Sequence, residues 1–301
     1  MSHLINYLIL IIPVLVNIAF ITLLERKILG YSQLRKGPNK VGLIGIFQPF
    51  NDAIKLFSKE LFIPSNSNFN QYLIAPLCAL LITLVRYSLF PLKEYIISIS
   101  WSFIFLYLFI SINIYPLLIS GWASNRKYAL IGSMRAIAQT VSYEVRLAAI
   151  LIFYIRISYS INIEILMSIN SLWNKVIILF PIMGIWFISC LAETNRTPFD
   201  FAEGESELVS GFNIEYGGIG FAIIFMAEYG RILFLSILFS ILFVSSSTSS
   251  VSLYVITSLL VSIWVWVRTT FPRYRYDKLI NLAWKVYLPI VLFILSYSIF
   301  F

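Results

Sequence analysis

The chain has too little charge for a water-soluble protein of its length. Only 12% of its 301 residues are Asp, Glu, Lys or Arg, while 59% are hydrophobic. Soluble domains have about 25% charged and about 45–50% apolar residues. Polar side chains are therefore too few to cover a soluble surface, which excludes a water-soluble globule, a disordered tail and a collagen-like fibre. The composition predicts an integral membrane protein.

Metal ligands are equally scarce. The chain has one histidine, His3, and two cysteines, Cys78 and Cys190, which lie far apart in apolar stretches. Haem, iron–sulfur and structural zinc sites usually need clustered His or Cys ligands, and a disulfide framework needs more cysteines than two. We therefore expect no metal site and no redox centre on this chain.

Eight apolar stretches are long enough, or nearly so, to cross a bilayer as helices, for which about 20 residues are needed. The sequence therefore predicts an all-α polytopic membrane protein, with a single membrane domain over residues 1–301. The predicted transmembrane helices are Leu4–Leu24, Tyr72–Phe90, Ile96–Ile119, Ala136–Ile157, Val176–Ala192, Ile219–Val244, Val251–Val267 and Leu282–Phe301.

The distribution of basic residues predicts the orientation of these helices. The loops after the first, third, fifth and seventh stretches hold sixteen Lys and Arg residues, whereas the opposite loops and margins hold three: Lys93, Arg156 and Lys175. Inner loops of membrane proteins carry the excess of positive charge. We therefore expect both termini to face outward. Topology accounts for most of the +8 net charge, so no nucleic-acid partner is needed to explain it.

Residues 47–63 contain a segment that is too short to span a bilayer but has two distinct faces. Its apolar residues recur at helical spacing, the charged residues take the other face, and Pro49 suits a first helical turn. The pattern predicts an amphipathic helix in the inner interface, and a simple lipid-surface anchor is the alternative. The apolar residues are Phe50, Ala53, Ile54, Phe57 and Leu61.

Charged residues inside the predicted spans mark candidate functional positions, since charges in lipid are costly and usually functional. In the fourth span Glu144 points nearly opposite to a polar face, which indicates either the wall of a polar cavity or a buried structural pair. That polar face consists of Arg135, Gln139, Ser142 and Arg146.

Two further spans carry charges. In the sixth, Glu228 and Arg231 are three residues apart, so they are close enough to face together and to neutralise each other locally. Arg86, near the outer end of the second span, has the pattern of a snorkelling arginine, whose head reaches out to the interface.

The loop over residues 193–218 is acidic on the side where the other loops are basic, with Arg196 as its one base. Crowded carboxylates raise each other's pKa, so such a cluster can hold and transfer protons near neutral pH. A solvated acidic loop is the alternative, but Phe199, Phe201 and Phe212 lie among the acids and argue against full solvation. The acids are Glu193, Asp200, Glu203, Glu205, Glu207 and Glu215.

Four blocks of this sequence are long and specific, and through them the chain resembles subunit 1 of the proton-pumping NADH:ubiquinone oxidoreductases (respiratory complex I) in the mitochondrial form. The eight-helix plan of that family covers the whole chain. The first block is Glu25–Tyr31 with Arg35–Gly42, Gln48–Pro49 and Asp52–Ala53, and the second is Gly121–Asn125 with Arg135 and Ser142–Val145. The third is Ala192–Asp200 with Glu203–Gly211, and the fourth is Phe271–Asp277.

The resemblance implies a subunit at the heel of the membrane arm, under the hydrophilic arm, in the mitochondrial inner membrane with both termini towards the intermembrane space. It implies contacts with membrane lipid and with other complex I subunits in both arms. Ubiquinone would be the substrate that enters through this chain. NADH, flavin mononucleotide and iron–sulfur clusters would belong to other subunits.

The same resemblance implies roles for individual residues, with no catalytic residue on this chain alone. Quinone-binding residues would be Arg26, Asp52, Phe225, Met226, Tyr229 and Arg275. The proton path would use Tyr143, Glu144, Glu193, Asp200, Glu203, Glu205, Glu207 and Glu228, with supporting charges Glu25, Arg135 and Arg196.

Three other interpretations remain open from the residues. A stand-alone secondary transporter would use Arg135, Glu144 and Glu228 as its ion site, although the chain lacks the clear internal repeat that many transporters have. A structural anchor for a peripheral enzyme would need no intramembrane acids. The related membrane subunit of energy-converting hydrogenases lacks the quinone tunnel.

Overall fold

The computed structural model describes residues 2–90, 101–163, 165, 176–201, 204, 211–244 and 251–300. Over these residues the chain is a bundle of helices without a strand. Seven helical segments are long and apolar enough to cross a membrane, and an eighth, Phe180–Glu193, is shorter. The predicted all-α polytopic fold is therefore confirmed.

The helices follow the predicted spans with shifted ends. A 3₁₀ turn, η4 (Gly211–Glu215), precedes α10, and a π-helical turn over Ala283–Tyr287 joins α12 to α13. The bounds are α1 Ser2–Ser32, α2 Gln48–Phe57, α3 Phe69–Arg86, α4 Ser102–Ile112, α5 Ile114–Ala123, α6 Lys127–Ser158, α8 Val176–Glu193, α10 Gly218–Phe243, α11 Val251–Thr270, α12 Tyr276–Leu282 and α13 Leu288–Phe300.

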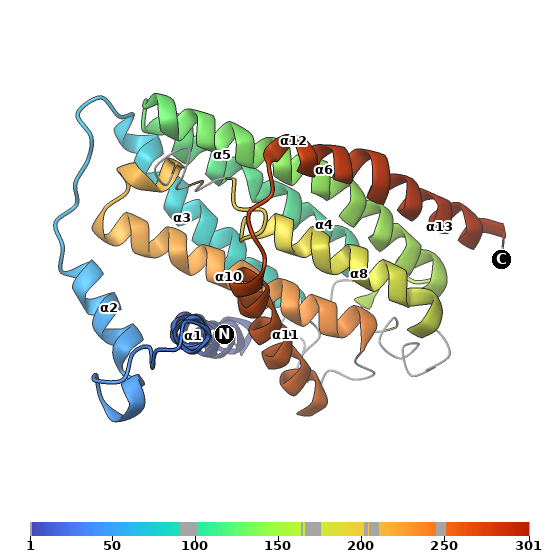
Figure 1. Cartoon of the computed structure of the whole chain (residues 1–301), viewed down its shortest axis with the longest axis horizontal. Coiled ribbons are helices and arrows are strands. Elements are labelled where there is room, and N and C mark those ends of the chain that lie inside the picture. Colours follow the sequence, from blue (N-terminus) through green and yellow to red (C-terminus); the bar gives the residue numbers. More distant parts are fainter. Residues whose placement is uncertain are drawn as a thin grey trace.

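Two helices organise the bundle. In Figure 1, α3, α5, α6, α10 and α13 run along the long axis, while α1 is seen nearly end-on and α2 lies at one end of the molecule. Helix α10 packs against α3, α11 and α1, and helix α6 packs against α5, α8 and α13. The other helices of the bundle therefore pack around α10 and α6.

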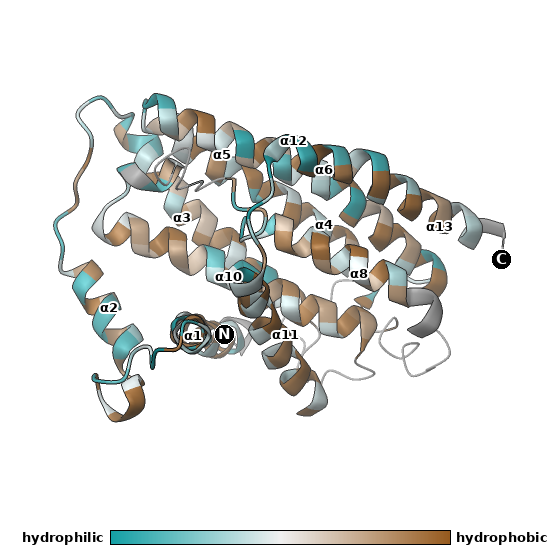
Figure 2. Cartoon of the chain, viewed as in Figure 1, coloured by the Kyte–Doolittle hydropathy of each residue, from teal (hydrophilic) through white to brown (hydrophobic). Residues whose placement is uncertain are grey.

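The outer surface of the bundle is apolar, as a surface that contacts lipid must be. Ile9 and Ile12 on α1, Phe180 on α8 and Phe293 on α13 are each more than 60% exposed. Figure 2 shows that hydrophobic residues make up much of the long helices, while hydrophilic residues are frequent in the connection between α2 and α3. In water such a surface would aggregate, whereas in a bilayer it is solvated by hydrocarbon.

The third predicted span is interrupted. Helix α4 ends at Ile112 and α5 begins at Ile114, with Asn113 between them. Pro116 explains the break, because it has no N–H to donate to the carbonyl of Ile112 and its ring clashes with a continuing helix. It is well placed in the first turn of α5, where a missing N–H does no harm.

A second proline, Pro76, frees a carbonyl of α3 that is bound by the end of the acidic loop. Pro76 leaves the carbonyl of Tyr72 without its helical donor, and the Tyr216 hydroxyl donates to that oxygen at 3.3 Å. The two tyrosine rings stack with centroids 4.3 Å apart, and the Tyr72 hydroxyl donates to the Glu215 carbonyl at 2.5 Å. Burial raises the pKa of Tyr216, so its hydroxyl keeps the proton that it donates.

The predicted interfacial helix is present but short. Helix α2 covers Gln48–Phe57 rather than the whole of residues 47–63. It ends where the Ser58 hydroxyl donates to the Lys55 carbonyl at 3.0 Å. Pro64 disfavours a helical conformation at the residue directly before it, Ile63. Helix α2 packs on α1 and α10.

The prediction for Arg86 is wrong. Its side chain is buried, with the residue 1% exposed, instead of reaching out to the interface. One guanidinium nitrogen donates to the Phe109 carbonyl at 2.6 Å, and the group lies 5.7 Å from the centre of the Phe234 ring. The end of α3 turns this residue toward α4 and α10, where a carbonyl and an aromatic face stabilise the charge.

The close approach of α5 and α6 makes Gly121 a sensitive position. An added Cβ there would lie 2.1 Å from Ser133 Oγ and 3.1 Å from the Ala129 carbonyl. We expect Gly121→Ala to lower the free energy of unfolding by about 1–3 kcal/mol through overpacking, measured as a lower thermal midpoint in detergent. The matched control is Gly184→Ala in α8, where an added Cβ meets nothing within 4 Å. Equal midpoints for the two variants would contradict the helix contact.

Candidate functional site

Glu25 is a buried carboxylate at the inner part of α1, and groups from two other helices bind it. The Tyr229 hydroxyl from α10 donates to Oε2 at 2.5 Å, and Arg268 from α11 forms an ion pair with Oε1. Glu25 is 5% exposed. A buried charge is tolerated only when it is paired and hydrogen-bonded, and Glu25 has both kinds of partner.

Arg196, from the loop after α8, joins Glu25 to a second buried carboxylate. Its NH1 lies 3.9 Å from Glu25 Oε1, and its NH2 lies 3.6 Å from Glu228 Oε2 on α10. The guanidinium also lies 4.7 Å from the centre of the Tyr229 ring. One arginine therefore connects carboxylates of α1 and α10. Arg196 is therefore the ion-pair partner of Glu228, and Arg231 also acts electrostatically on this carboxylate, as the three-residue spacing predicted.

The first part of the acidic loop is folded into the bundle rather than solvated. Gln139 Nε2 on α6 donates to the carbonyls of Ala192 and Phe199, both at 2.8 Å. Phe199 packs against Tyr143, with ring centroids 6.1 Å apart, and Asp200 is paired with Arg273 at 3.4 Å. The interleaved aromatic residues thus indicated the burial of this part correctly.

Further buried charged residues lie between Glu228 and helix α6. Glu193, the last residue of α8, is 3% exposed and lies within electrostatic range of Arg86, Arg231 and Glu144. Arg231 acts in turn on Glu228. Each of these charges therefore lies within electrostatic range of the next one.

Glu144 ends this series on α6. It is half-buried and within hydrogen-bonding range of the hydroxyls of Tyr107 and Ser111 on α4. We call the series the charged row, which runs from α1 to α6 through Glu25, Arg196, Glu228, Arg231, Glu193 and Glu144.

Aromatic residues on one side of α10 lead toward the charged row. The rings of Phe221 and Phe225 lie 4.3 Å apart and those of Phe225 and Tyr229 6.2 Å apart, because residues four apart share a helical face. We call these three residues the aromatic ladder. Met226 is half-buried beside it. Tyr229 belongs to both features, since its ring ends the ladder and its hydroxyl binds Glu25.

Two of the predicted quinone residues join α1 to α2. Arg26 forms an ion pair with Asp52, and Gln48 donates to the same carboxylate at 3.0 Å. The contact of Phe20 with Phe50, at 6.1 Å between ring centroids, adds an apolar link between the helices.

The structure does not bring every predicted residue to this region. The side chain of Arg275 is 78% exposed and paired with Asp277 at 3.2 Å. Arg135 is half-buried on α6 and acts electrostatically on Tyr276. Tyr143 is buried, with the Arg146 guanidinium 3.9 Å from its ring centre. Glu203, Glu205 and Glu207 lie outside the described residues.

Sequence reasoning missed Arg268 as a site residue. The signal was present, because Arg268 follows the seventh predicted span on the same inner side as Glu25. Only the packing of α1 on α11 shows that the two side chains meet.

Comparison with known proteins places the chain in a family. The family model described as NADH dehydrogenase matches residues 5–299. The chain belongs to the NADH dehydrogenase family. It is 51% identical over 294 residues to NADH-ubiquinone oxidoreductase chain 1 of Locusta migratoria, covering 98% of this chain and 94% of the relative.

Two further members of the NADH dehydrogenase family are similar over nearly the whole chain. Chain 1 of Aedes aegypti is 48% identical over 299 residues, with 99% of this chain and 94% of the relative covered. That of Monodelphis domestica is 47% identical over 296 residues, with 96% and 93% covered. The predicted resemblance is confirmed over nearly the whole chain.

The position of Arg196 between two buried carboxylates predicts a large effect of its removal. We expect Arg196→Met to lower the free energy of unfolding by about 3–5 kcal/mol, because Glu25 and Glu228 lose a shared partner in a low-dielectric interior. The thermal midpoint in detergent measures this. The control is Arg275→Met, which removes an exposed ion pair worth about 0–1 kcal/mol. Similar small shifts for both variants would show that Arg196 does not stabilise the pair.

Proposed function

We propose that this chain is the membrane subunit of a proton-pumping NADH:ubiquinone oxidoreductase in the mitochondrial inner membrane. In this proposal it lines much of the path by which ubiquinone reaches its reduction site, and it starts the charged path that couples reduction to proton movement. The observation that carries the proposal is Tyr229, which ends the aromatic ladder and binds Glu25 of the charged row.

The aromatic ladder supports the quinone path. An isoprenoid quinone needs an apolar channel that opens sideways to lipid, and aromatic faces stack on its ring. The ladder lies on α10, α2 packs on α10 and α1, and Arg26 and Asp52 join α1 to α2. We propose that the opening lies between these three helices, with Met226 in the wall. Arg275 would join the path when a neighbouring subunit covers its exposed side.

The charged row supports the coupling. Quinone reduction takes two electrons, supplied by another subunit, and two protons. A headgroup beside Tyr229 would lie next to the Glu25 carboxylate, and a change of charge there would act on Arg196 and then on Glu228. Each member lies within range of the next, so the effect would extend to Glu144. Glu203, Glu205, Glu207, Asp200 and Tyr143 would contribute to the same path.

The proposal assigns the remaining chemistry to partners. NADH, flavin mononucleotide and iron–sulfur clusters would be held by other complex I subunits, in the hydrophilic and membrane arms. The apolar exterior would contact lipid and neighbouring membrane subunits. The basic inner loops would place both termini towards the intermembrane space.

We expect Glu144→Gln to depress both quinone reductase activity and proton pumping by at least about tenfold while the complex still assembles. A glutamine keeps the shape but cannot transfer a proton, and a positioned proton carrier contributes at least a factor of this size. NADH oxidation and proton uptake by membrane vesicles measure the two effects. The control is Glu215→Gln. The Glu215 carboxylate lies away from the charged row, with Oε1 3.8 Å from Arg126 Nε. Normal turnover and coupling in assembled Glu144→Gln would exclude this role.

We expect Arg26→Ala to weaken binding of quinone-site inhibitors by about ten- to a hundredfold, the loss expected for one charge-assisted hydrogen bond. Inhibitor titration of NADH oxidation measures it in the assembled complex. Lys127→Ala is the control, because Lys127 is an exposed cation at the start of α6. Superimposable titration curves for Arg26→Ala and wild type would remove Arg26 from the quinone path.

A further inference from the structure

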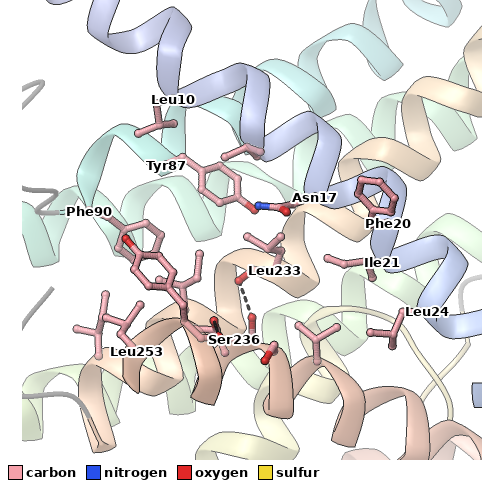
Figure 3. A pocket seen from close by; sticks show the side chains of 17 residues that line it. Leu10, Asn17, Phe20, Ile21, Leu24, Tyr87, Phe90, Leu233, Ser236 and Leu253 are labelled. Carbon is pink, nitrogen blue, oxygen red and sulfur yellow. Dashed lines mark hydrogen bonds between the residues drawn. The ribbon is translucent and has the colours of Figure 1, made fainter. Parts of the chain in front are cut away.

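The bundle contains hollows of two kinds, one at its surface and one in its interior. Figure 3 shows a hollow of about 440 Å³ between α1, α10 and α11, where the polar lining residues Asn17 and Ser258 are exposed. A much smaller cavity, of about 10 Å³, lies between α3, α5 and α10, and nearly all of its lining residues are buried. The polar groups of this interior cavity are therefore shielded from the surroundings of the bundle.

Small side chains and a helix break leave this interior space. Ala75 and Ala79 lie one turn apart on α3, so their methyl groups share a face, and Ala227 adds a third methyl group from α10. On the opposite side the cavity is lined by Asn113, which lies between α4 and α5, and by Pro116. The break thus places a polar residue of an otherwise apolar span at the cavity.

Arg231 lines the cavity from α10 and forms no hydrogen bond with the described part of the chain. The residue is 3% exposed, and its Nε and Nη1 are buried without a hydrogen-bond acceptor. Glu228 and Glu193 act on it electrostatically, but neither forms an ion pair with it. A guanidinium has five N–H donors, and leaving buried donors of a charged group unsatisfied is costly.

Asn113 and Ser120 offer acceptors at the same cavity. Asn113 is 3% exposed, and its amide forms no hydrogen bond with the residues that the structure describes. The Ser120 hydroxyl donates to the Leu117 carbonyl at 2.8 Å, so its oxygen can still accept. The cavity therefore lies between unused donors of Arg231 and unused acceptors of two other residues.

The size and lining of the cavity limit what it can hold. One buried water needs about 10–15 Å³ and two to four polar partners. The cavity has about 10 Å³, which leaves no room for a polyatomic ligand. Cavities with an apolar lining stay dry, but this one is lined by a guanidinium, an amide and a hydroxyl.

We propose that this cavity binds one internal water molecule. The water accepts a hydrogen bond from Arg231 and donates to the side-chain oxygens of Asn113 and Ser120, which gives the three hydrogen bonds typical of a buried water. Asn113 is then a positioning residue, which acts through the water on Arg231 and so supports its charge beside Glu228 and Glu193. The water site does not depend on the proposed function, whereas its effect on proton pumping rests on it.

The direct test is a density map of the intact complex at a resolution that shows buried waters. In the wild type we expect one water at about 2.7–3.2 Å from Arg231 and from Asn113, and in Asn113→Leu none at this site. We expect the density to persist when gluconate replaces chloride in the buffer. A wild-type map without the water would overturn the proposal. Loss of the density without chloride would overturn it too, because the ligand would then be an anion.

The positioning role is tested by proton uptake of membrane vesicles. We expect Asn113→Leu to lower the rate about tenfold, because a hydrogen bond to a charged group is worth at least this factor. Added to Arg231→Met, the same change is expected to lower the rate by less than about twofold, since residues that act through one another are not additive. A purely structural role of Asn113 would not depend on Arg231.

Two serines of α5 provide a matched pair. We expect Ser120→Ala to lower the rate about threefold, the loss of one neutral hydrogen bond. Ser124→Ala is the control, because the Ser124 hydroxyl also bonds its own helix, to the Gly121 carbonyl at 2.9 Å, but does not line the cavity. Equal rates for the two serine variants would count against the site.

The water site and the proposed function fail separately. A tenfold loss on adding Asn113→Leu to Arg231→Met would show that Asn113 acts elsewhere, which overturns the positioning role. A water in the map together with normal pumping in Asn113→Leu would confirm the water site and overturn only that role. If Asn113→Leu does not assemble, the wild-type map and the serine pair still decide.

Discussion

The Arg196 guanidinium between Glu25 and Glu228 is the contact on which the inner half of the bundle depends. It comes from a loop, yet it lies against carboxylates of α1 and α10 and against the Tyr229 ring. The loop is held there by Gln139, which binds its backbone on both sides of Arg196. Because buried charges require partners, the position of this loop and the packing of α1 on α10 determine each other.

Tyr229 gives this electrostatic arrangement an apolar neighbour. Its ring continues the stack of Phe221 and Phe225, while its hydroxyl binds Glu25. Interactions between charges are far stronger in a low-dielectric interior than in water. A change of charge at the end of the aromatic ladder would therefore act on Glu25 with little screening, which is the property that an energy-coupling site requires.

The sequence predicted elements that depend on local composition and periodicity, and it failed where distant segments meet. Apolar length gave the spans, and aromatic residues among the acids gave the buried loop. Spacing correctly placed Arg231 within electrostatic range of Glu228, but it could not show that Arg196 from another segment pairs with the same carboxylate. Arg86 was misjudged because hydropathy does not show which side of a helix faces protein. Pro116 was a local signal for the break before α5. The residues on both sides of the break are apolar, so apolar length alone predicted one continuous helix.

The balance of charges explains why proton movement in this region would be coupled to another event. Among the described residues, the charged row with the flanking Arg86 and Arg268 contains four carboxylates and four arginines, and Asp200 beside Glu228 is paired with Arg273. With every group ionised the cluster is neutral. One added proton leaves a net positive charge inside a medium that solvates it poorly. Protonation therefore becomes favourable only when negative charge appears nearby, and electrons arriving on a quinone beside Tyr229 would supply it. In the proposed function, departure of the neutral quinol would again destabilise an extra proton, which would then move along the row.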